Sequence, residues 1–179
     1  MSSILIVGVK DSVTHSVAPL HWIIADKTGA CMTIEKTAEG LHLLDNSIGV
    51  LSNSPDFNWH MTNLRNYMNL SPYQYQEAEW NSTRLTPFGQ GGGSFGLPGG
   101  FTPTARFVRA AYTKNHTDIP DSTEEAVTAC FHIMENISIP KGMVMTDRGT
   151  PDYTQYTAFI DISSQEYFSE PMITAKPSL

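Results

Sequence analysis

The order of strand-like and helix-like segments is the feature that most constrains what this chain can fold into. Short β-rich segments come first, separated by turns rich in Gly, Asn, Asp and Ser, which predicts a meander of antiparallel strands. One face of such a sheet has to be covered by another layer. The predicted strands are Ser3 to Gly8, Leu20 to Asp26, Cys31 to Thr37, Leu41 to Asp45 and Ile48 to Ser52.

Three helices are predicted to follow. The first begins at Ser54-Pro55, an N-cap followed by proline at the first helical position, and the second begins in the same way at Thr102-Pro103 and runs to about Lys114. The third begins at Ser122, where Glu125 completes a capping box. An apolar stripe predicts the inner face of the first helix, at Phe57, Met61, Leu64 and Met68.

Strands return at Tyr153 to Ile162 and Gln165 to Ser169. Strands, then helices, then strands predict an α+β fold with helices layered on antiparallel sheet, formed by a single domain over residues 1–179.

A long stretch without an obvious helix or strand pattern, Ser71 to Phe101, separates the first two helices. It contains seven of the 13 glycines and several aromatic residues, so we expect an ordered excursion that lines a site, contacts another subunit, or does both. Gly91 to Gly96 has the spacing of a dinucleotide-binding loop, but Pro87 precedes it and Pro98 follows it, where that motif needs a strand and a helix. The glycines are better explained by positive φ angles or by close approach of the backbone.

Composition excludes several classes of protein. The formal net charge is −7 without a basic run, which argues against nucleic-acid binding, and the longest apolar stretches are too short to span a bilayer. Cys31 and Cys130 form neither a disulfide framework nor a zinc motif, and the six histidines have no metal-site spacing, so we expect no metal and no cofactor. Met1-Ser2-Ser3 lacks the features of a secretion signal, so the expected location is the cytoplasm.

Two polar residues are placed where local structure does not require them. Arg106 falls in the first turn of the second helix, where the helix dipole disfavours a cation, and this indicates a functional constraint. Arg109 lies one turn later, and for this residue a surface or ion-pairing role fits the sequence as well as a functional one does. Asn53 immediately precedes the first helix, where its amide is able to donate to a developing oxyanion, although asparagine is also common in ordinary turns.

Several strings in this order resemble the choloylglycine hydrolase family, which contains bile salt hydrolases and penicillin V acylases. The resemblance extends over nearly the whole chain, and Leu85 to Gly91 is most similar to the penicillin V acylase branch. The strings that carry it are Leu51-Ser52-Asn53-Ser54-Pro55, Asn58-Trp59-His60, Thr62-Asn63-Leu64-Arg65-Asn66-Tyr67, Gly96-Leu97-Pro98-Gly99-Gly100-Phe101-Thr102 and Ala105-Arg106-Phe107-Val108-Arg109-Ala110-Ala111.

The resemblance implies an N-terminal nucleophile hydrolase with an αββα sandwich of antiparallel sheets. It implies hydrolysis of a small-molecule acyl amide through an acyl-cysteine intermediate, with the α-amino group of the N-terminal cysteine as base. Asn53 then corresponds to an oxyanion-hole residue and Arg106 to a residue beside the nucleophile. We expect Trp59, Tyr73 and Phe95 to contact the acyl group, and we expect a homo-oligomer, a tetramer in this family, in which the stretch Ser71 to Phe101 reaches across an interface.

One departure from the family leaves two hypotheses open. In the family these strings belong to the later part of a longer chain, and the segment with the nucleophilic cysteine precedes them. Cys31 lies within a predicted strand and Cys130 on the apolar face of a predicted helix, so neither replaces that cysteine. The chain is therefore expected to be the later part of an amidase that works with a missing N-terminal portion. The alternative is a truncated, non-catalytic member that folds or docks with a partner.

Overall fold

The computed structural model describes residues 10, 12, 15, 17 and 20–171, so the predicted strand Ser3 to Gly8 lies outside the described residues. The chain divides into two compact units, Met1–Leu51 and Ser52–Leu179.

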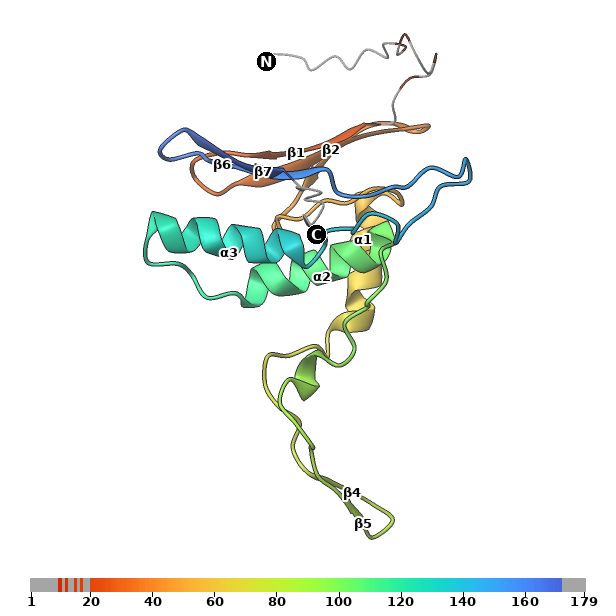
Figure 1. The fold of residues 1–179 in the computed structure, drawn as a ribbon, viewed down its shortest axis with the longest axis vertical. Coiled ribbons are helices and arrows are strands. Elements are labelled where there is room, and N and C mark those ends of the chain that lie inside the picture. Colours follow the sequence, from red (N-terminus) through yellow and green to blue (C-terminus); the bar gives the residue numbers. More distant parts are fainter. Residues whose placement is uncertain (1–9, 11, 13–14, 16, 18–19, 172–179) are drawn as a thin grey trace, which may run out of the picture. The chain divides into compact units, whose positions relative to one another are not determined.

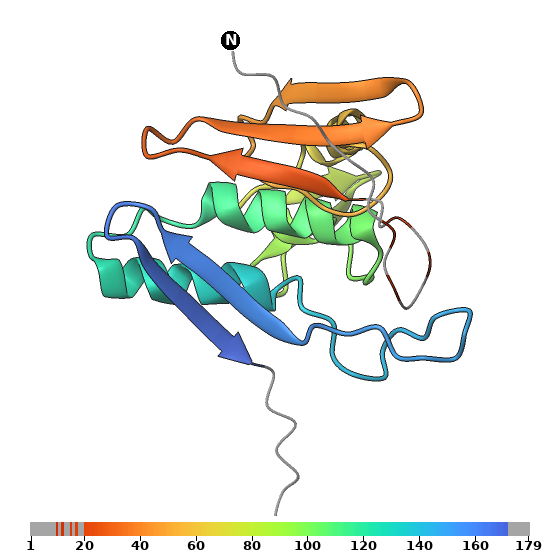
Figure 2. The same cartoon turned by 90° about the horizontal axis from the view of Figure 1, so that it is seen from above.

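The first unit contains a three-stranded antiparallel sheet in the order β1-β2-β3 (Figure 2). Its strands are β1 (His21–Ala25), β2 (Cys31–Thr37) and β3 (Gly40–Asp45). In the register, Ile34 of β2 lies opposite both Trp22 of β1 and Leu43 of β3. The predicted meander is confirmed for these three strands, because the short turns between them let each strand pair with its neighbour in sequence.

The prediction of a further strand at Ile48 to Ser52 was wrong, because the fully buried side chain of Asn46 shapes this segment as a turn. Asn46 Nδ2 donates to Val50 O at 3.0 Å and to Thr33 Oγ1 at 2.9 Å, and Asn46 Oδ1 accepts from Gly49 N at 2.8 Å. Gly49 has a φ of +65°, which fits a tight turn and not an extended strand.

The first helix of the second unit is α1 (Phe57–Leu64), continued by a 3-10 turn, η1 (Arg65–Tyr67). The prediction of Ser54 as its N-cap was wrong: Asp56 is the cap, and its carboxylate accepts a hydrogen bond from Trp59 N at 2.9 Å. The predicted apolar stripe is also wrong at Met68, which lies beyond the helical turns and is exposed. Phe57 and His60 are the residues of α1 that are buried.

The two longer helices begin at the predicted caps. Thr102 caps α2 (Pro103–His116) by accepting from Ala105 N, and Ser122 caps α3 (Thr123–Glu135) by accepting from Glu125 N. The Glu125 carboxylate closes this turn from the other side, accepting from Asp121 N at 3.0 Å. Figure 2 shows α2 and α3 running side by side.

A second antiparallel pair, β6 (Tyr156–Asp161) and β7 (Glu166–Pro171), lies against α3 (Figure 2). Phe131 of α3 meets Phe159 of β6 edge to face at 4.8 Å, and Phe159 stacks on Phe168 of β7. The most deeply buried apolar residues of this unit are on α1 and α2, and they include Phe57, Phe107 and Val108.

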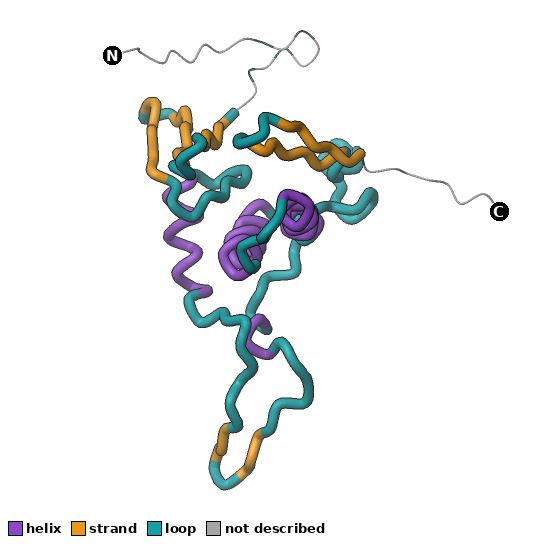
Figure 3. The backbone as a smooth tube through the Cα atoms, turned by 90° about the vertical axis from the view of Figure 1, so that its left-hand side faces the viewer, coloured by secondary structure: helices purple, strands orange, loops and turns teal. Residues whose placement is uncertain are grey.

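Residues 71–101, which we call the arm, extend away from the helices of the second unit (Figures 1 and 3). The predicted absence of a regular helix or strand pattern is confirmed for most of these residues and is wrong for three short elements. The arm contains the antiparallel pair β4 (Ala78–Trp80) and β5 (Thr83–Leu85) and a 3-10 turn, η2 (Gly92–Ser94). The missed signal is Asn81-Ser82, whose positive φ angles of 47° and 64° form a two-residue hairpin turn.

The base of the arm is closed by its own backbone. Ser71 N donates to Gly93 O at 3.0 Å. A Cβ atom at Gly93 would overlap the carbonyl oxygens of Ser71 and Tyr73, so only glycine allows this approach. Gly91, with a φ of +84°, supplies the preceding turn, and both glycines confirm the roles expected for this glycine-rich segment.

Together these elements confirm the predicted α+β class with antiparallel sheets. Among the described residues, no helix has the length and apolar character that crossing a membrane requires.

Candidate active site

Asn53 lies just before α1, and two hydrogen bonds hold its backbone region in place. On one side, the Ser52 hydroxyl donates to the carbonyl oxygen of Pro103, in the first turn of α2, at 3.0 Å. On the other side, the carbonyl oxygen of Asn53 accepts from His60 Nε2, on α1, at 2.8 Å. The segment before α1 is thereby attached to both helices.

Arg106 of α2 reaches the side chain of Asn53. Arg106 Nη2 donates to Asn53 Oδ1 at 2.8 Å, and Arg106 Nε donates to the carbonyl oxygen of Phe101 at 3.2 Å. The two residues that stood out in the sequence are therefore in direct contact, although 53 positions separate them. Because the amide oxygen accepts from Arg106, the amide NH₂ group of Asn53 is turned away from the guanidinium and is able to donate elsewhere.

Asn53 and Arg106 line a cleft of about 740 Å³ within the second unit. Asp152 lines the same cleft, together with apolar and aromatic groups that include Phe101 and Tyr153. Burial lowers the pKa of Arg106, and the negative charge of Asp152 partly opposes this shift. The cleft thus combines an amide donor and a cation, which are suited to binding a group with developing negative charge, with a carboxylate whose charge acts in the opposite direction.

Sequence reasoning missed two residues of this arrangement. Asp152 is 46 positions from Arg106, and no local pattern relates the two. His60 carried a weak signal, since it lies three residues after Phe57 on the same face of α1, where an apolar residue would be expected.

Arg109 is buried and has a different role from Arg106. Its Nε donates to the carbonyl oxygen of Asn136 at 2.8 Å, and its Nη1 donates to those of Pro98 and Gly100 at 2.7 and 2.5 Å. Arg109 is therefore neither a surface residue nor part of a close ion pair within the described part of the chain. It connects α2 to the end of the arm and to the C-terminus of α3.

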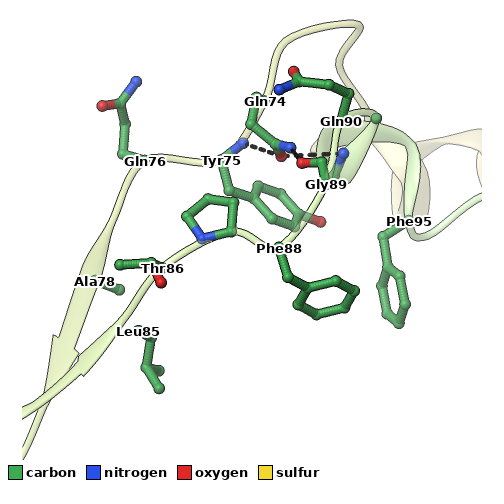
Figure 4. Close-up of a pocket in the computed structure, with 13 residues that line it drawn as sticks. Gln74, Tyr75, Gln76, Ala78, Leu85, Thr86, Phe88, Gly89, Gln90 and Phe95 are labelled. Atoms are coloured by element: carbon green, nitrogen blue, oxygen red, sulfur yellow. Dashed lines mark hydrogen bonds between the residues drawn. The ribbon is translucent and has the colours of Figure 1, made fainter.

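The three aromatic residues predicted to bind the acyl group lie outside this cleft. Trp59 borders a separate cavity of about 540 Å³ beside α1 and η1. Phe95 borders another, of about 710 Å³, on the arm, where Figure 4 shows its ring on the same side as that of Phe88. Tyr73 is also on the arm and is exposed.

Gln74 lines the arm cavity, and its side chain bridges backbone groups (Figure 4). Gln74 Nε2 donates to Gly89 O, and Gln74 Oε1 accepts from Tyr75 N at 2.8 Å and from Gly92 N at 3.1 Å. These bonds fix the shape of the arm between its base and the β4–β5 hairpin.

Cys130 does not have the surroundings of an activated nucleophile. Cys31 is the first residue of β2, and Cys130 lies within α3. Burial raises the pKa of the Cys130 thiol, which lowers the fraction of reactive thiolate. The described residues also contain no group of three or more His, Cys, Asp or Glu side chains placed to hold a metal ion.

Comparisons with known proteins give a consistent result. A family model described as "Linear amide C-N hydrolases, choloylglycine hydrolase family" matches residues 1–174. The chain is 38% identical over 168 residues to a conjugated bile acid hydrolase of Lactobacillus acidophilus, an alignment that covers 94% of this chain and 53% of the relative. The chain spans about half the length of the curated relatives it matches.

Solved structures show the same relationship. A mutant of the conjugated bile acid hydrolase from Clostridium perfringens aligns with a TM-score of 0.80 and 38% identity, covering 92% of this chain and 50% of that one. Penicillin V acylase from Agrobacterium tumefaciens aligns with a TM-score of 0.67 and 22% identity over 86% of this chain and 42% of that one, which shows the shared fold. The expected fold class is confirmed by these likenesses.

Proposed function

This chain belongs to the choloylglycine hydrolase family of linear amide C-N hydrolases, and we propose that it supplies the oxyanion-binding amide and the guanidinium group of an amidase active site. The observation that carries the proposal is the 2.8 Å hydrogen bond from Arg106 Nη2 to Asn53 Oδ1. This bond orients the amide so that its NH₂ group is available to the substrate, in a cleft lined by both residues.

In the proposed reaction, a cysteine thiolate attacks the carbonyl carbon of the substrate amide and forms a tetrahedral intermediate. Asn53 Nδ2 donates a hydrogen bond to the oxyanion, and the positive charge of Arg106 stabilises the negative charge near the nucleophile. Collapse of the intermediate expels the amine, which takes its proton from the protonated α-amino group of the cysteine, and leaves an acyl-cysteine. Water then hydrolyses the acyl-cysteine, which releases the acid and restores the cysteine. The thiolate comes from the N-terminal segment that precedes these strings in the family, since Cys31 and Cys130 are internal to a strand and a helix and have no free α-amino group to act as base.

The proposed substrate is a conjugated bile acid. This choice is supported by the 38% identity to the Lactobacillus acidophilus relative, which is named a conjugated bile acid hydrolase. Penicillin V is the second candidate, and the string Leu85 to Gly91 on the arm favours it. Both substrates are linear amides with a bulky apolar acyl group.

The proposal includes a homo-oligomer, a tetramer by resemblance to the family, and a cytoplasmic location in keeping with the composition. Tyr73 and Phe95 are on the arm, outside the cleft, so their proposed contact with an acyl group would be made across an interface between subunits. Trp59 would contribute from α1. In this arrangement the exposed aromatic side chains have a ligand or a second subunit to contact.

A chimera tests the proposed function. In the chimera, the part of the Lactobacillus acidophilus relative that precedes its aligned region is joined to the N-terminus of the 179-residue chain. Hydrolysis of a glycine-conjugated bile acid and of penicillin V by this chimera is then measured. We expect turnover of the bile acid amide that a thiol reagent abolishes. Asn53→Ala should lower kcat by about 10²- to 10³-fold, the usual effect of losing an oxyanion donor.

The matched control is Asn58→Ala, which alters an exposed asparagine of α1 that does not line the cleft and should leave kcat unchanged. A folded chimera without turnover of either substrate would favour the alternative of a non-catalytic family member. Turnover by the 179-residue chain alone that survives a thiol reagent would contradict the assigned chemistry.

A further inference from the structure

We propose that His60 is a positioning residue, which holds the main chain of Asn53 while Arg106 holds its side chain. The inference rests on the proposed function of Asn53 as an oxyanion donor. It adds a residue to the site that does not touch the substrate and acts only through Asn53.

The hydrogen bond between His60 and Asn53 defines the protonation of the ring. His60 Nε2 lies 2.8 Å from the carbonyl oxygen of Asn53, and His60 is fully buried, with 0% of its surface exposed. Because a carbonyl oxygen only accepts hydrogen bonds, Nε2 carries the proton and donates it. In a neutral ring, Nδ1 then keeps its lone pair.

Ring packing fixes the direction of that donor. The imidazole stacks on Phe107 of α2, with ring centroids 4.5 Å apart and planes 13° from parallel, and the ring centroid of Trp59 lies 5.7 Å away with its plane nearly perpendicular. Phe107 directly follows Arg106, the residue that donates to Asn53 Oδ1. Asn53 is thus held at both its main chain and its side chain by neighbouring positions on one helix, directly by Arg106 and through the imidazole by Phe107.

A second observation argues that the histidine is not there for packing alone. His60 Nδ1 is buried and has no hydrogen-bond partner among the described residues. A buried acceptor without a partner destabilises a fold, so an apolar side chain of the same size would be the better choice at a purely structural position. A local feature that opposes stability is expected where function requires it.

Two substitutions separate the donor from the ring volume. In His60→Gln, the side-chain amide nitrogen reaches about as far as Nε2 and still donates to Asn53 O, whereas His60→Leu keeps an apolar group of similar size and removes the donor. In ¹H–¹⁵N NMR spectra of the full 179-residue chain, the side-chain signals of Asn53 NH₂ and Arg106 Nε–H should shift or broaden in the Leu variant and stay near their wild-type positions in the Gln variant.

The same pair is then measured in the chimera described above. We expect His60→Leu to lower kcat by at least about 10-fold with KM nearly unchanged, because misplacing an oxyanion donor affects the transition state more than the bound substrate. His60→Gln should recover most of kcat. His116→Leu, which removes an exposed histidine that also stacks on an aromatic ring of α2, should change neither the spectra nor kcat.

Equal losses of kcat in the Gln and Leu variants, or unchanged Asn53 and Arg106 signals in the Leu variant, would overturn the proposal. If the Leu variant does not fold, ¹⁵N NMR of the wild-type imidazole decides: a ring protonated at Nε2 with slow hydrogen exchange supports the proposal, and a ring protonated at Nδ1 overturns it. An inactive wild-type chimera would refute the proposed function, while the NMR comparison would still decide the role of His60.

Discussion

Two arginines one helical turn apart, Arg106 and Arg109, differ in role because their surroundings differ. Arg106 lies in the first turn of α2, where the positive end of the helix dipole opposes its charge, and it contacts Asn53 at the edge of the cleft. Arg109 is 7% exposed and donates to three backbone carbonyl oxygens of the described residues. Burial lowers the pKa of Arg109, and the positive charge of Arg106 lowers it further. One guanidinium thus contacts a side chain at the cleft, and the other holds backbone segments together.

At the residue scale, the turn after β1 gives a prediction about pH. The Asp26 carboxylate accepts from Thr28 Oγ1 at 2.6 Å and from Thr28 N at 2.8 Å, and these bonds hold the pKa of Asp26 below its ordinary value of 3.8. A folded-state pKa below the unfolded one contributes stability above pH 3.8, which is lost as the pH falls through the folded-state value. Thr28→Val should therefore raise the pKa of Asp26 towards its ordinary value. The variant should then lose less stability than the wild type as the pH falls.

An NMR titration of the Asp26 carboxyl carbon measures the shift. Asp161 is the internal control, because hydrogen bonds from Ser164 and Ser163 lower its pKa and Thr28 is not among the causes. An unchanged Asp26 titration in Thr28→Val would show that the hydroxyl group does not set this pKa.

Sequence reasoning at this scale worked where a residue conflicts with its local surroundings. Arg106 opposes the helix dipole and Asn53 precedes a helix start, and both features are visible within a few positions of the chain. Asp152 and the His60–Asn53 bond were not foreseen, because they depend on which segments meet in space. Whether Asn53 and Arg106 act in catalysis stays a prediction.

At the scale of elements, Arg109 joins three segments of the second unit. Its guanidinium accounts for hydrogen bonds to Pro98, Gly100 and Asn136, which belong to the end of the arm and to the C-cap of α3. Arg109→Met keeps much of the side-chain volume and leaves these carbonyl oxygens without their donor. We expect a loss of about 1–3 kcal/mol in the free energy of unfolding, measured by urea denaturation.

The control for Arg109→Met is Arg84→Met on the arm. Arg84 is largely exposed and pairs with Glu77, so its loss should change the free energy of unfolding by less than about 1 kcal/mol. Equal effects of the two substitutions would contradict the structural role of Arg109.

The elements that were predicted well are those with local determinants. The caps Thr102 and Ser122 are confirmed because each needs only a hydroxyl group next to a helical segment. The predicted N-cap of α1 was wrong because the sequence offers two capping residues close together: Ser54, which was predicted, and Asp56, which caps the helix. The strand expected at Ile48 to Ser52 does not form, because the side chain of Asn46 makes hydrogen bonds to the backbone of Gly49 and Val50. Asparagine is common in turns.

At the scale of the whole molecule, the exposed aromatic residues of the arm predict self-association. Trp80, in β4, is 72% exposed, and Phe88 is fully exposed beside the arm cavity. If the arm mediates the proposed oligomer, the double variant Trp80→Ser, Phe88→Ser should reduce the molar mass measured by light scattering during gel filtration.

Ile119→Ser provides the control, because Ile119 is 92% exposed and lies in the connection between α2 and α3, outside the arm. This control should leave the molar mass unchanged. A monomeric wild-type protein, or an oligomer that the arm variant does not affect, would argue against association through the arm.

The fold class at this scale followed from the order of segments alone, and family membership followed from strings spread along the chain. The division into two units, Met1–Leu51 and Ser52–Leu179, was not foreseen. No change in composition marks that boundary, and the segment that crosses it was expected to be a continuous strand.

The closed base of the arm makes the polypeptide between Ser71 and Gly93 a separable insert. The backbone hydrogen bond between Ser71 and Gly93 holds the two ends of this segment together. The residues between them are therefore free to differ in number and type without altering the helices on either side. Exchanging residues 72–92 between relatives would therefore change the surface of the arm and leave Asn53 and Arg106 in place. A relative with a different arm would then present a different surface and still keep the hydrogen bond between these two side chains.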